Sequence, residues 1–334
     1  MKKIKLFLPV FLAISLVCGT ILCTDFLRNE QGTMPISPAL RQESLPQEEY
    51  LRLLVAGVDE TGELCDVLIL FSVNRQTGEL WGLQLPRDTY ARYSEGSYRK
   101  LNGAASALGG MTGLRDFLEE SLSLEIDGYL RLSPDTLRQG VDALGGLEVC
   151  LDRDMDYEDP AQGLSIHLSA GTQTLDGNMA EQFVRYRAGY ARGDLDRMDA
   201  QKQFLSALYE KVKEDLTPIG AVRIAASLWD TVQTDLTLSE IGDLASLLFR
   251  IDPTRVFLVT APGEDAVAKK SGASYFVLSY PSMDRLLRDH FGGEAGGFDP
   301  HRVFLNENYE EFQRIYRENI ACEPYSLGQL SQKA

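Results

Sequence analysis

Apolar segments between residues 51 and 85 constrain the fold of this chain more than any other feature. LRLLVAGVD (51–59) and DVLILFSVN (66–74) are almost continuously apolar, and LWGLQL (80–85) follows the turn-like sequence RQTGE. Continuous apolar strands of this length are typical of a sheet that is covered on both faces. With the turn between the last two segments, they predict antiparallel strands at the centre of an α/β domain.

Helical and strand patterns alternate along the rest of the chain. Ser133-Pro134 carries the N-cap and first-turn residues of a helix that ends before Gly145-Gly146, and LEVCL (147–151) follows as a strand. A further strand is predicted at 255–260, and further helices at 113–123, 176–187, 194–216, within 221–249 and at 281–291. This order predicts an α/β fold with a mixed central β-sheet flanked by helices on both faces.

The N-terminus combines a basic segment with an apolar one. Lysines at 2, 3 and 5 precede an uncharged run of about 18 residues, roughly 27 Å as a helix. We interpret residues 1–5 as cytoplasmic and residues 6–24 as an uncleaved transmembrane helix with the remainder outside the cell; a cleaved signal peptide is the alternative. Residues 25–49, rich in Pro, Gln, Ser and Glu, are typical of a tether. One folded domain is therefore predicted over residues 50–334.

Composition argues against several classes of function. The net charge is −16, and the basic residues before the apolar run leave the rest of the chain still more acidic, which disfavours binding to nucleic acid. Three cysteines lie beyond the apolar run, an odd number without a C-x-x-C pair, so neither a disulfide framework nor a zinc site is predicted: Cys65, Cys150 and Cys322. The histidines are scattered, and no nucleophile-elbow, Walker or Rossmann pattern is present.

Charged residues follow the predicted central strands. If the second and third apolar segments are antiparallel, Arg87 and Asp88 leave one strand close to Asp66 at the entrance of the other, and a short loop brings Asp59 to the same edge. Asp66 and Asp88 could simply cap turns or pair with Arg87, but carboxylates beside arginines also suit a Mg²⁺ ion that bridges phosphate oxygens. By its spacing alone, Lys100 would be a surface lysine.

A cluster of arginines follows further along this acidic chain. Arg185, Arg187, Arg192 and Arg197 could form a solvated helical face. Arg185 and Arg187 are two residues apart, so both can serve one site only if the backbone bends or the site wraps around the helix end. Arg197 and Gln201 share a face near a helix N-terminus, where an anion would gain dipole and guanidinium contacts. The residues thus favour an extracytoplasmic phosphate or pyrophosphate site.

An ordered set of segments resembles the LytR-CpsA-Psr family. The set consists of LLVAGVD, the Asp66 that precedes VLIL, LPRDT, KLN, Gly109-Gly110, VDALGGLEV, LDGNMAEQFVRYR, and GDLDR with a following Gln. The similarity extends from about Leu51 to Leu208. It implies an α/β sheet flanked by helices, with an apolar pocket for a prenyl chain and a pyrophosphate at the mouth of that pocket.

The resemblance also implies an activity and a location. Family members look like transferases of Gram-positive cell wall biogenesis, which move a teichoic acid- or capsule-type glycan phosphate from a polyprenyl-pyrophosphate carrier to peptidoglycan. The expected partners are therefore the lipid-linked glycan, peptidoglycan and the membrane, and no nucleic acid. The protein would be a single-pass cell membrane protein, anchored through residues 6–24, with its C-terminal domain outside the cell.

Individual residues acquire expected roles from the same resemblance. Asp59 and Asp66 match the acidic pair that engages Mg²⁺ or the acceptor, and with Arg87 and Asp88 they form the expected catalytic group. The expected ligands of the pyrophosphate are Arg87, Lys100, Arg185, Arg187, Arg197 and Gln201.

Two positions differ from the family pattern. Leu64 stands where an arginine usually precedes the second aspartate, and Ala200 stands where an arginine usually precedes the late glutamine. These differences keep two alternatives open. The protein could be a noncatalytic prenyl-pyrophosphate-binding or wall-assembly scaffold protein, or a pyrophosphatase that uses water as the acceptor.

Overall fold

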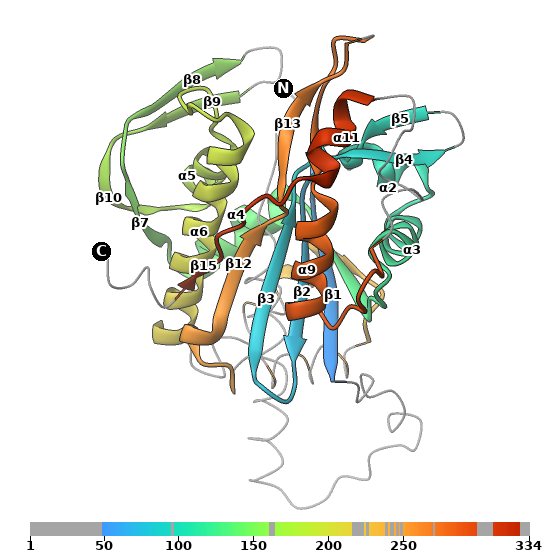
Figure 1. The fold of residues 1–334 in the computed structure, drawn as a ribbon. Helices are drawn as coiled ribbons and strands as arrows, with labels where there is room; N and C mark the ends of the chain where they lie inside the picture. Colours follow the sequence, from blue (N-terminus) through green and yellow to red (C-terminus); the bar gives the residue numbers. More distant parts are fainter. Residues whose placement is uncertain are drawn as a thin grey trace, which may run out of the picture. The chain divides into compact units, whose positions relative to one another are not determined.

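The computed structural model describes two compact units of the chain (Figure 1). One, here called the sheet unit, comprises Glu48–Arg131 and Pro253–Lys333; the other, the helical unit, includes Leu132–Asp252. The residues described are 49–94, 97–159, 164–215, 224, 227–237, 240, 244, 247, 250–269, 271–298 and 310–327.

The predicted membrane helix lies outside these described residues, as do the cytoplasmic segment and almost all of the tether. Within the described part, no helix has both the length and the apolar character needed to cross a membrane.

The sheet unit contains the predicted mixed sheet. Its strands lie in the order β6-β1-β2-β3-β12-β15. Their bounds are β1 (Tyr50–Val58), β2 (Cys65–Asn74), β3 (Glu79–Leu85), β6 (Gly128–Leu132), β12 (Val256–Thr260) and β15 (Tyr325–Ser326). The pairs β1–β2, β2–β3 and β12–β15 are antiparallel, whereas β12 is parallel to β3. The strands predicted at 51–59, 66–74, 80–85 and 255–260 are thereby confirmed.

Continuous burial explains why the central strands are apolar throughout. Every residue from Leu51 to Val58 is buried, so neither face of β1 meets solvent. On one face, Phe71 and Leu258 close over Gly82, where an added Cβ would lie 2.8 Å from the Phe71 ring and 2.6 Å from a Leu258 methyl. The glycine in LWGLQL therefore permits the neighbouring side chains to pack across β3.

Helix α9 (Tyr280–His290) packs on the sheet, as predicted for residues 281–291 (Figure 1). The Trp81 ring stacks with His290 at 3.6 Å and with Phe257 at 4.6 Å between ring centroids. At the end of the same helix, Arg52 Nε donates to the carbonyl oxygen of Phe291 at 2.8 Å. These contacts join α9 to β1 and β3, and Trp81 in turn packs on β12.

Short elements complete the sheet unit. They include the antiparallel hairpins β4–β5 and β13–β14, which the sequence did not predict, and the helices α3 and α11. The bounds are β4 (Tyr90–Ser94), β5 (Ser97–Lys100), η2 (Leu101–Gly103), α2 (Ala104–Ala107), α3 (Met111–Leu122), η4 (Pro253–Arg255), β13 (Gly263–Val267), β14 (Ser274–Leu278) and α11 (Glu310–Arg317). Tyr90 meets Tyr275 and Phe312 edge-on, which joins β4, β14 and α11 into one aromatic cluster.

The helical unit confirms the helices predicted around residues 134, 176 and 194. Its elements are α4 (Pro134–Ala143), β7 (Leu147–Leu151), β8 (Met155–Asp159), β9 (Leu164–Leu168), β10 (Gly171–Leu175), α5 (Gly177–Arg185), α6 (Asp194–Asp215), η3 (Trp229–Thr231) and β11 (Val232–Thr234). Ser133 caps α4 in a capping box with Thr136, and Asp176 caps α5. Strand β7 pairs with β10 and β8 pairs with β9, both antiparallel.

The helical structure predicted within residues 221–249 was wrong for residues 229–234. Residues 229–234 form a 3₁₀ turn followed by the short strand β11. The β-branched residues of TVQT favour an extended backbone, and this local preference outweighs the apolar spacing.

Candidate functional site

The register of the central strands brings predicted site residues to one end of the sheet. Val58 pairs with Cys65, and Leu68 pairs with Leu85. The loop after β1, the start of β2 and the exit of β3 therefore meet at the same edge, as the sequence predicted.

Asp66 and Arg87 form an ion pair at this edge. Arg87 Nη1 donates to Asp66 Oδ1 at 2.9 Å, and the two side chains are only 17% and 12% exposed, respectively. A charged hydrogen bond that is largely shielded from water is stronger than an exposed one. Asp66 therefore orients the guanidinium of Arg87.

The backbone that carries Arg87 and Asp88 is held from two sides. The Arg87 carbonyl accepts the Asn102 amide of η2 at 3.0 Å, and the Asp88 carbonyl accepts the Phe276 amide of β14 at 2.8 Å. These bonds explain how a buried strand ends in two adjacent opposite charges: neighbouring elements satisfy the turn backbone, so the two side chains are not needed for that purpose.

Lys100 joins this group. Its Nζ lies 3.0 Å from Asp88 Oδ1, and Arg87 Nε lies 4.0 Å from the same oxygen. The pairing of Tyr90 with Lys100 in the β4–β5 hairpin sets this position. Because the hairpin was not predicted, sequence spacing alone left Lys100 as a surface lysine.

Asp59 organises its own loop. Its carboxylate accepts the Thr61 hydroxyl at 2.9 Å, the Glu63 amide at 2.9 Å and the Leu64 amide at 3.1 Å. This carboxylate therefore caps the turn of the β1–β2 loop. A ligand that engages Asp59 would meet a carboxylate whose orientation is already fixed.

The β1–β2 loop is also tied to β6. Gly62 has φ 75°, in the region that favours glycine, and its carbonyl accepts Arg131 Nη2 at 3.0 Å. No local pattern predicted this role for Arg131, which is 69 residues away along the chain.

Cys65 lies at the same edge but is buried beneath it. Burial raises the pKa of the Cys65 thiol to about 12, opposed by the charge of Arg131. A thiol of this kind stays protonated and is a poor nucleophile. The chemistry of this edge therefore belongs to its carboxylates and cations.

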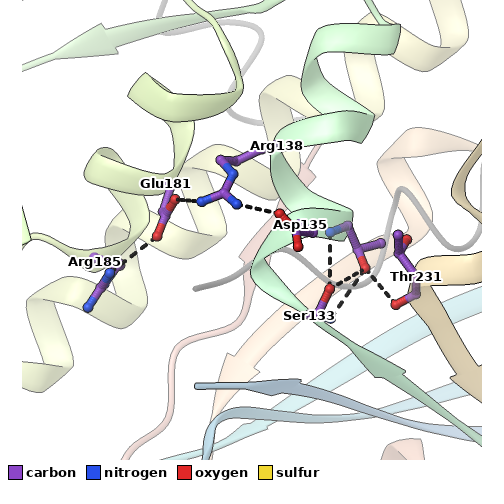
Figure 2. A network of polar contacts seen from close by, with 7 residues as sticks. Ser133, Asp135, Arg138, Glu181, Arg185 and Thr231 are labelled. Atoms are coloured by element: carbon purple, nitrogen blue, oxygen red, sulfur yellow. Dashed lines mark hydrogen bonds and ion pairs between the residues drawn. The ribbon is translucent and has the colours of Figure 1, made fainter. Parts of the chain in front are cut away.

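In the helical unit, Arg185 is held by a buried acid (Figure 2). The Glu181 side chain, which is 9% exposed, lies between Arg185 of α5 and Arg138 of α4. Arg138 also pairs with Asp135, one helical turn earlier. This network was not predicted from the sequence, although the four-residue spacing of Glu181 and Arg185 on a helix is a signal that could have revealed one of its pairs.

The backbone bends between Arg185 and Arg187. Helix α5 ends at Arg185, and Tyr186 is extended, with φ −60° and ψ 135°. Arg187 is therefore outside the helix and exposed to solvent. The bend that the spacing of these arginines required is present, while their binding role stays a prediction.

Arg197 and Gln201 are buried and have partners within the helical unit. Arg197 Nη2 lies 2.8 Å from Asp194 Oδ1, and Gln201 Nε2 donates to the Val184 carbonyl at 3.3 Å. These contacts fix the first turns of α6, and the second links α6 to α5. Phosphate binding by either residue remains a prediction.

The two positions that differ from the expected pattern have different environments. Leu64 is 39% exposed in the β1–β2 loop, whereas Ala200 on α6 is 8% exposed. An arginine at position 64 would reach solvent, but one at position 200 would have to be accommodated among buried side chains.

Comparison with known proteins decides the family. The LytR_cpsA_psr family is matched over residues 28–291. This chain belongs to the LytR-CpsA-Psr family. The match continues well beyond Leu208, where the recognisable segments ended.

Relatives of this LytR-CpsA-Psr protein include wall-biosynthesis proteins. The "Polyisoprenyl-teichoic acid--peptidoglycan teichoic acid transferase TagU" of Oceanobacillus iheyensis is 30% identical over 251 residues, 72% of this chain and 75% of that protein. The "Probable cell wall biosynthesis protein LcpB" of Corynebacterium glutamicum is 34% identical over 193 residues, 58% of this chain and less than half of the relative, 45%.

Solved structures share the LytR-CpsA-Psr fold. Bacillus subtilis TagV has a TM-score of 0.62 at 23% identity, covering 73% of this chain and 96% of TagV. A structure of TagT bound to LI-WTA has a TM-score of 0.60 at 25% identity, covering 75% of this chain and 92% of that one. These similarities support the fold of a mixed sheet flanked by helices.

Proposed function

We propose that this LytR-CpsA-Psr protein is a membrane-anchored phosphotransferase that attaches a teichoic acid- or capsule-type glycan from a polyprenyl-pyrophosphate carrier to peptidoglycan. Relatives named as teichoic acid transferases support the proposal, as does the TagT structure with LI-WTA. The observation that carries it is the Asp66–Arg87 ion pair, because it supplies a fixed carboxylate and a fixed guanidinium at one edge of the sheet.

The proposed reaction replaces a pyrophosphate bond with a phosphodiester bond. A peptidoglycan hydroxyl oxygen attacks the phosphorus that carries the glycan, and the bond from this phosphorus to the bridging oxygen breaks. The carrier leaves as polyprenyl monophosphate with the bridging oxygen and its electron pair. The hydroxyl proton passes to a carboxylate.

The described residues suit these tasks. Asp59 and Asp66 are the carboxylates proposed to receive the proton and orient the acceptor. Arg87 would stabilise negative charge as the bridging oxygen departs, and Asp88 fixes the position of a second cation, Lys100. The remaining proposed phosphate ligands are Arg185, Arg187, Arg197 and Gln201.

A magnesium ion fits the donor chemistry of this edge. Among the described residues, no group of three or more histidine, cysteine or acidic side chains could enclose a metal. Mg²⁺ commonly uses one or two carboxylates together with substrate phosphate oxygens, and Asp59 and Asp66 would be those carboxylates. Bound there, the ion would neutralise charge on phosphate oxygens.

The location follows from the same proposal. Lipid carrier and peptidoglycan meet at the outer face of a Gram-positive cell membrane, so residues 6–24 would hold the protein there as a single-pass anchor. The net charge of −16 is consistent with a partner that is recognised by a local cationic group rather than by the overall charge.

A transfer assay tests the proposed function. The full chain in detergent would be incubated with Mg²⁺, a glycan labelled on its polyprenyl-pyrophosphate carrier, and peptidoglycan. Label on peptidoglycan is the expected result. Label released to solution would indicate a pyrophosphatase instead, and label that stays on a protein-bound lipid would indicate binding without transfer.

Binding without transfer is the second candidate, and Leu64 and Ala200 favour it. If the unmodified protein binds the lipid without turnover, Leu64→Arg should restore part of the transfer, because this position is exposed enough to accept a guanidinium. Leu64→Gln is the matched control without the charge. Turnover by the unmodified protein would eliminate this candidate.

A further inference from the structure

Glu181 binds two arginines through two different oxygens. Its Oε1 lies 3.2 Å from Arg185 Nη1 on the same helix, and its Oε2 lies 2.8 Å from Arg138 Nη1 on α4 (Figure 2). All three side chains are largely shielded, with Glu181 9%, Arg185 12% and Arg138 17% exposed. A carboxylate can offer a separate oxygen to each guanidinium group at once.

The charges in this network balance in pairs. Asp135 pairs with Arg138, and Glu181 is shared by Arg138 and Arg185. A shielded carboxylate that faced Arg185 without a second cation would oppose any anion that Arg185 binds. Arg138 offsets that effect while it leaves the hydrogen bond to Arg185 intact.

The base of the network is fixed by the start of α4. Ser133 and Thr136 form a reciprocal capping box, and the Thr136 hydroxyl donates to the Thr231 carbonyl at 2.9 Å (Figure 2). Asp135 and Arg138 lie one turn apart on this anchored helix. The start of α4 therefore helps to fix the position of Arg138.

We propose that Glu181 is a positioning residue for Arg185, and that Arg138 neutralises Glu181 so that Arg185 presents its positive charge to a phosphate. This inference rests on the proposed function, which assigns Arg185 to the pyrophosphate. Glu181 would thus support the pyrophosphate site from below its surface, and Arg138 would control the net charge around Arg185.

A double substitution separates this role from simple structural support. In Arg138→Leu, the Glu181 carboxylate loses the cation at Oε2, and its full charge opposes binding of an anion near Arg185. We expect the affinity for inorganic pyrophosphate to fall about tenfold. In the double variant Arg138→Leu/Glu181→Gln, the neutral amide oxygen can still accept from Arg185, and the affinity should return to within about threefold of the unmodified protein.

The measurement is calorimetric titration of the full chain in detergent with inorganic pyrophosphate. Arg314→Leu is the matched control, because it removes an exposed arginine that also bridges two acids, Glu264 and Glu318. Melting temperatures of all variants would be recorded, because the less compensated Glu181 of Arg138→Leu can also lower stability, and a change in affinity must be separated from a change in folding.

Each outcome decides one point. Weak binding by Arg138→Leu with recovery in the double variant supports the positioning role. Unchanged binding by Arg138→Leu, or a double variant as weak as the single one, overturns it while the proposed function stands. An unmodified protein that does not bind pyrophosphate contradicts the proposed function itself, and the role of Arg138 falls with it.

Discussion

Asp66 and Arg87 are 21 residues apart in the sequence and 2.9 Å apart in the structure. The pair joins the start of β2 to the exit of β3, and hydrogen bonds from η2 and β14 hold the backbone beside it. Its position at the sheet edge therefore depends on the antiparallel register of the central hairpin rather than on local sequence.

Removing the charge of Asp66 should impair transfer without unfolding the protein. In Asp66→Asn the side chain keeps its shape but loses the charge that orients Arg87, so we expect the rate of transfer to fall at least about tenfold. The assay is transfer of labelled glycan to peptidoglycan. Asp116→Asn is the control, since Asp116 is an exposed acid paired with Arg115 on α3. Equal rates for both variants would contradict the assigned role.

The β1–β2 loop should tolerate substitution less well than the β2–β3 turn. Gly62 and Gly78 have similar φ values, 75° and 70°, so alanine at either position should cost about 1 kcal/mol of unfolding free energy. A Cβ at Gly62 would also displace Arg131 from the Gly62 carbonyl, at an added cost of about 1 kcal/mol. Gly78 has nothing within 4 Å of such a Cβ. Denaturant unfolding that shows equal losses would refute the role of Arg131.

The cap of α4 should contribute measurably to stability. Ser133→Ala removes the hydroxyl that accepts the Thr136 amide and should lower the free energy of unfolding by about 1 kcal/mol. Ser133→Asp, which retains an acceptor at the cap, should recover most of that loss. If the alanine and aspartate variants unfold at the same denaturant concentration, the side-chain acceptor at position 133 does not stabilise α4, the helix that carries Arg138.

Two histidines should titrate on opposite sides of their ordinary value. Burial lowers the pKa of His290, which stacks on Trp81, whereas hydrogen bonds to Glu158 and Asp156 raise the pKa of the exposed His167. Heteronuclear NMR of the imidazole signals across pH would measure both. If both histidines titrated at the same pH, at least one of the two described environments would be contradicted.

The lowered pKa of His290 has a consequence for stability. The unfolded chain binds this proton more readily than the folded one, so the contribution of His290 to stability is lost as pH falls through its unfolded and then its folded pKa. The unfolding free energy of the unmodified protein should therefore drop relative to His290→Phe between about pH 7 and pH 5. His167 has the opposite sign, since its contribution is lost as pH rises through its raised pKa, but it is common to both proteins and cancels. A constant difference would contradict the account.

Much of the sheet edge could be predicted because its residues directly follow the strands that the apolar pattern defines. Once β2 and β3 are antiparallel, the meeting of Asp66 with Arg87 depends only on their register. Lys100 could not be placed in this way, because its contact with Asp88 depends on the β4–β5 hairpin, whose polar and short strands carry a weak signal.

The network around Glu181 illustrates the limit of sequence spacing more clearly. Glu181 and Arg185 share a helix, so their contact could have been predicted, but Arg138 is 43 residues from Glu181 and reaches it through the packing of α4 on α5. In the same way, the burial of Arg197 and Gln201 follows from tertiary packing, which overrides the expectation that arginine and glutamine lie on the surface.

The most direct measurement compares the unmodified full chain with Arg87→Ala for transfer of labelled glycan from polyprenyl pyrophosphate to peptidoglycan. Arg314→Ala serves as the control for loss of a surface arginine. We expect Arg87→Ala to fold normally and to transfer glycan about 10²- to 10³-fold more slowly, because the charge that develops on the departing oxygen is no longer stabilised. Transfer by Arg87→Ala at the rate of the unmodified protein would contradict this expectation.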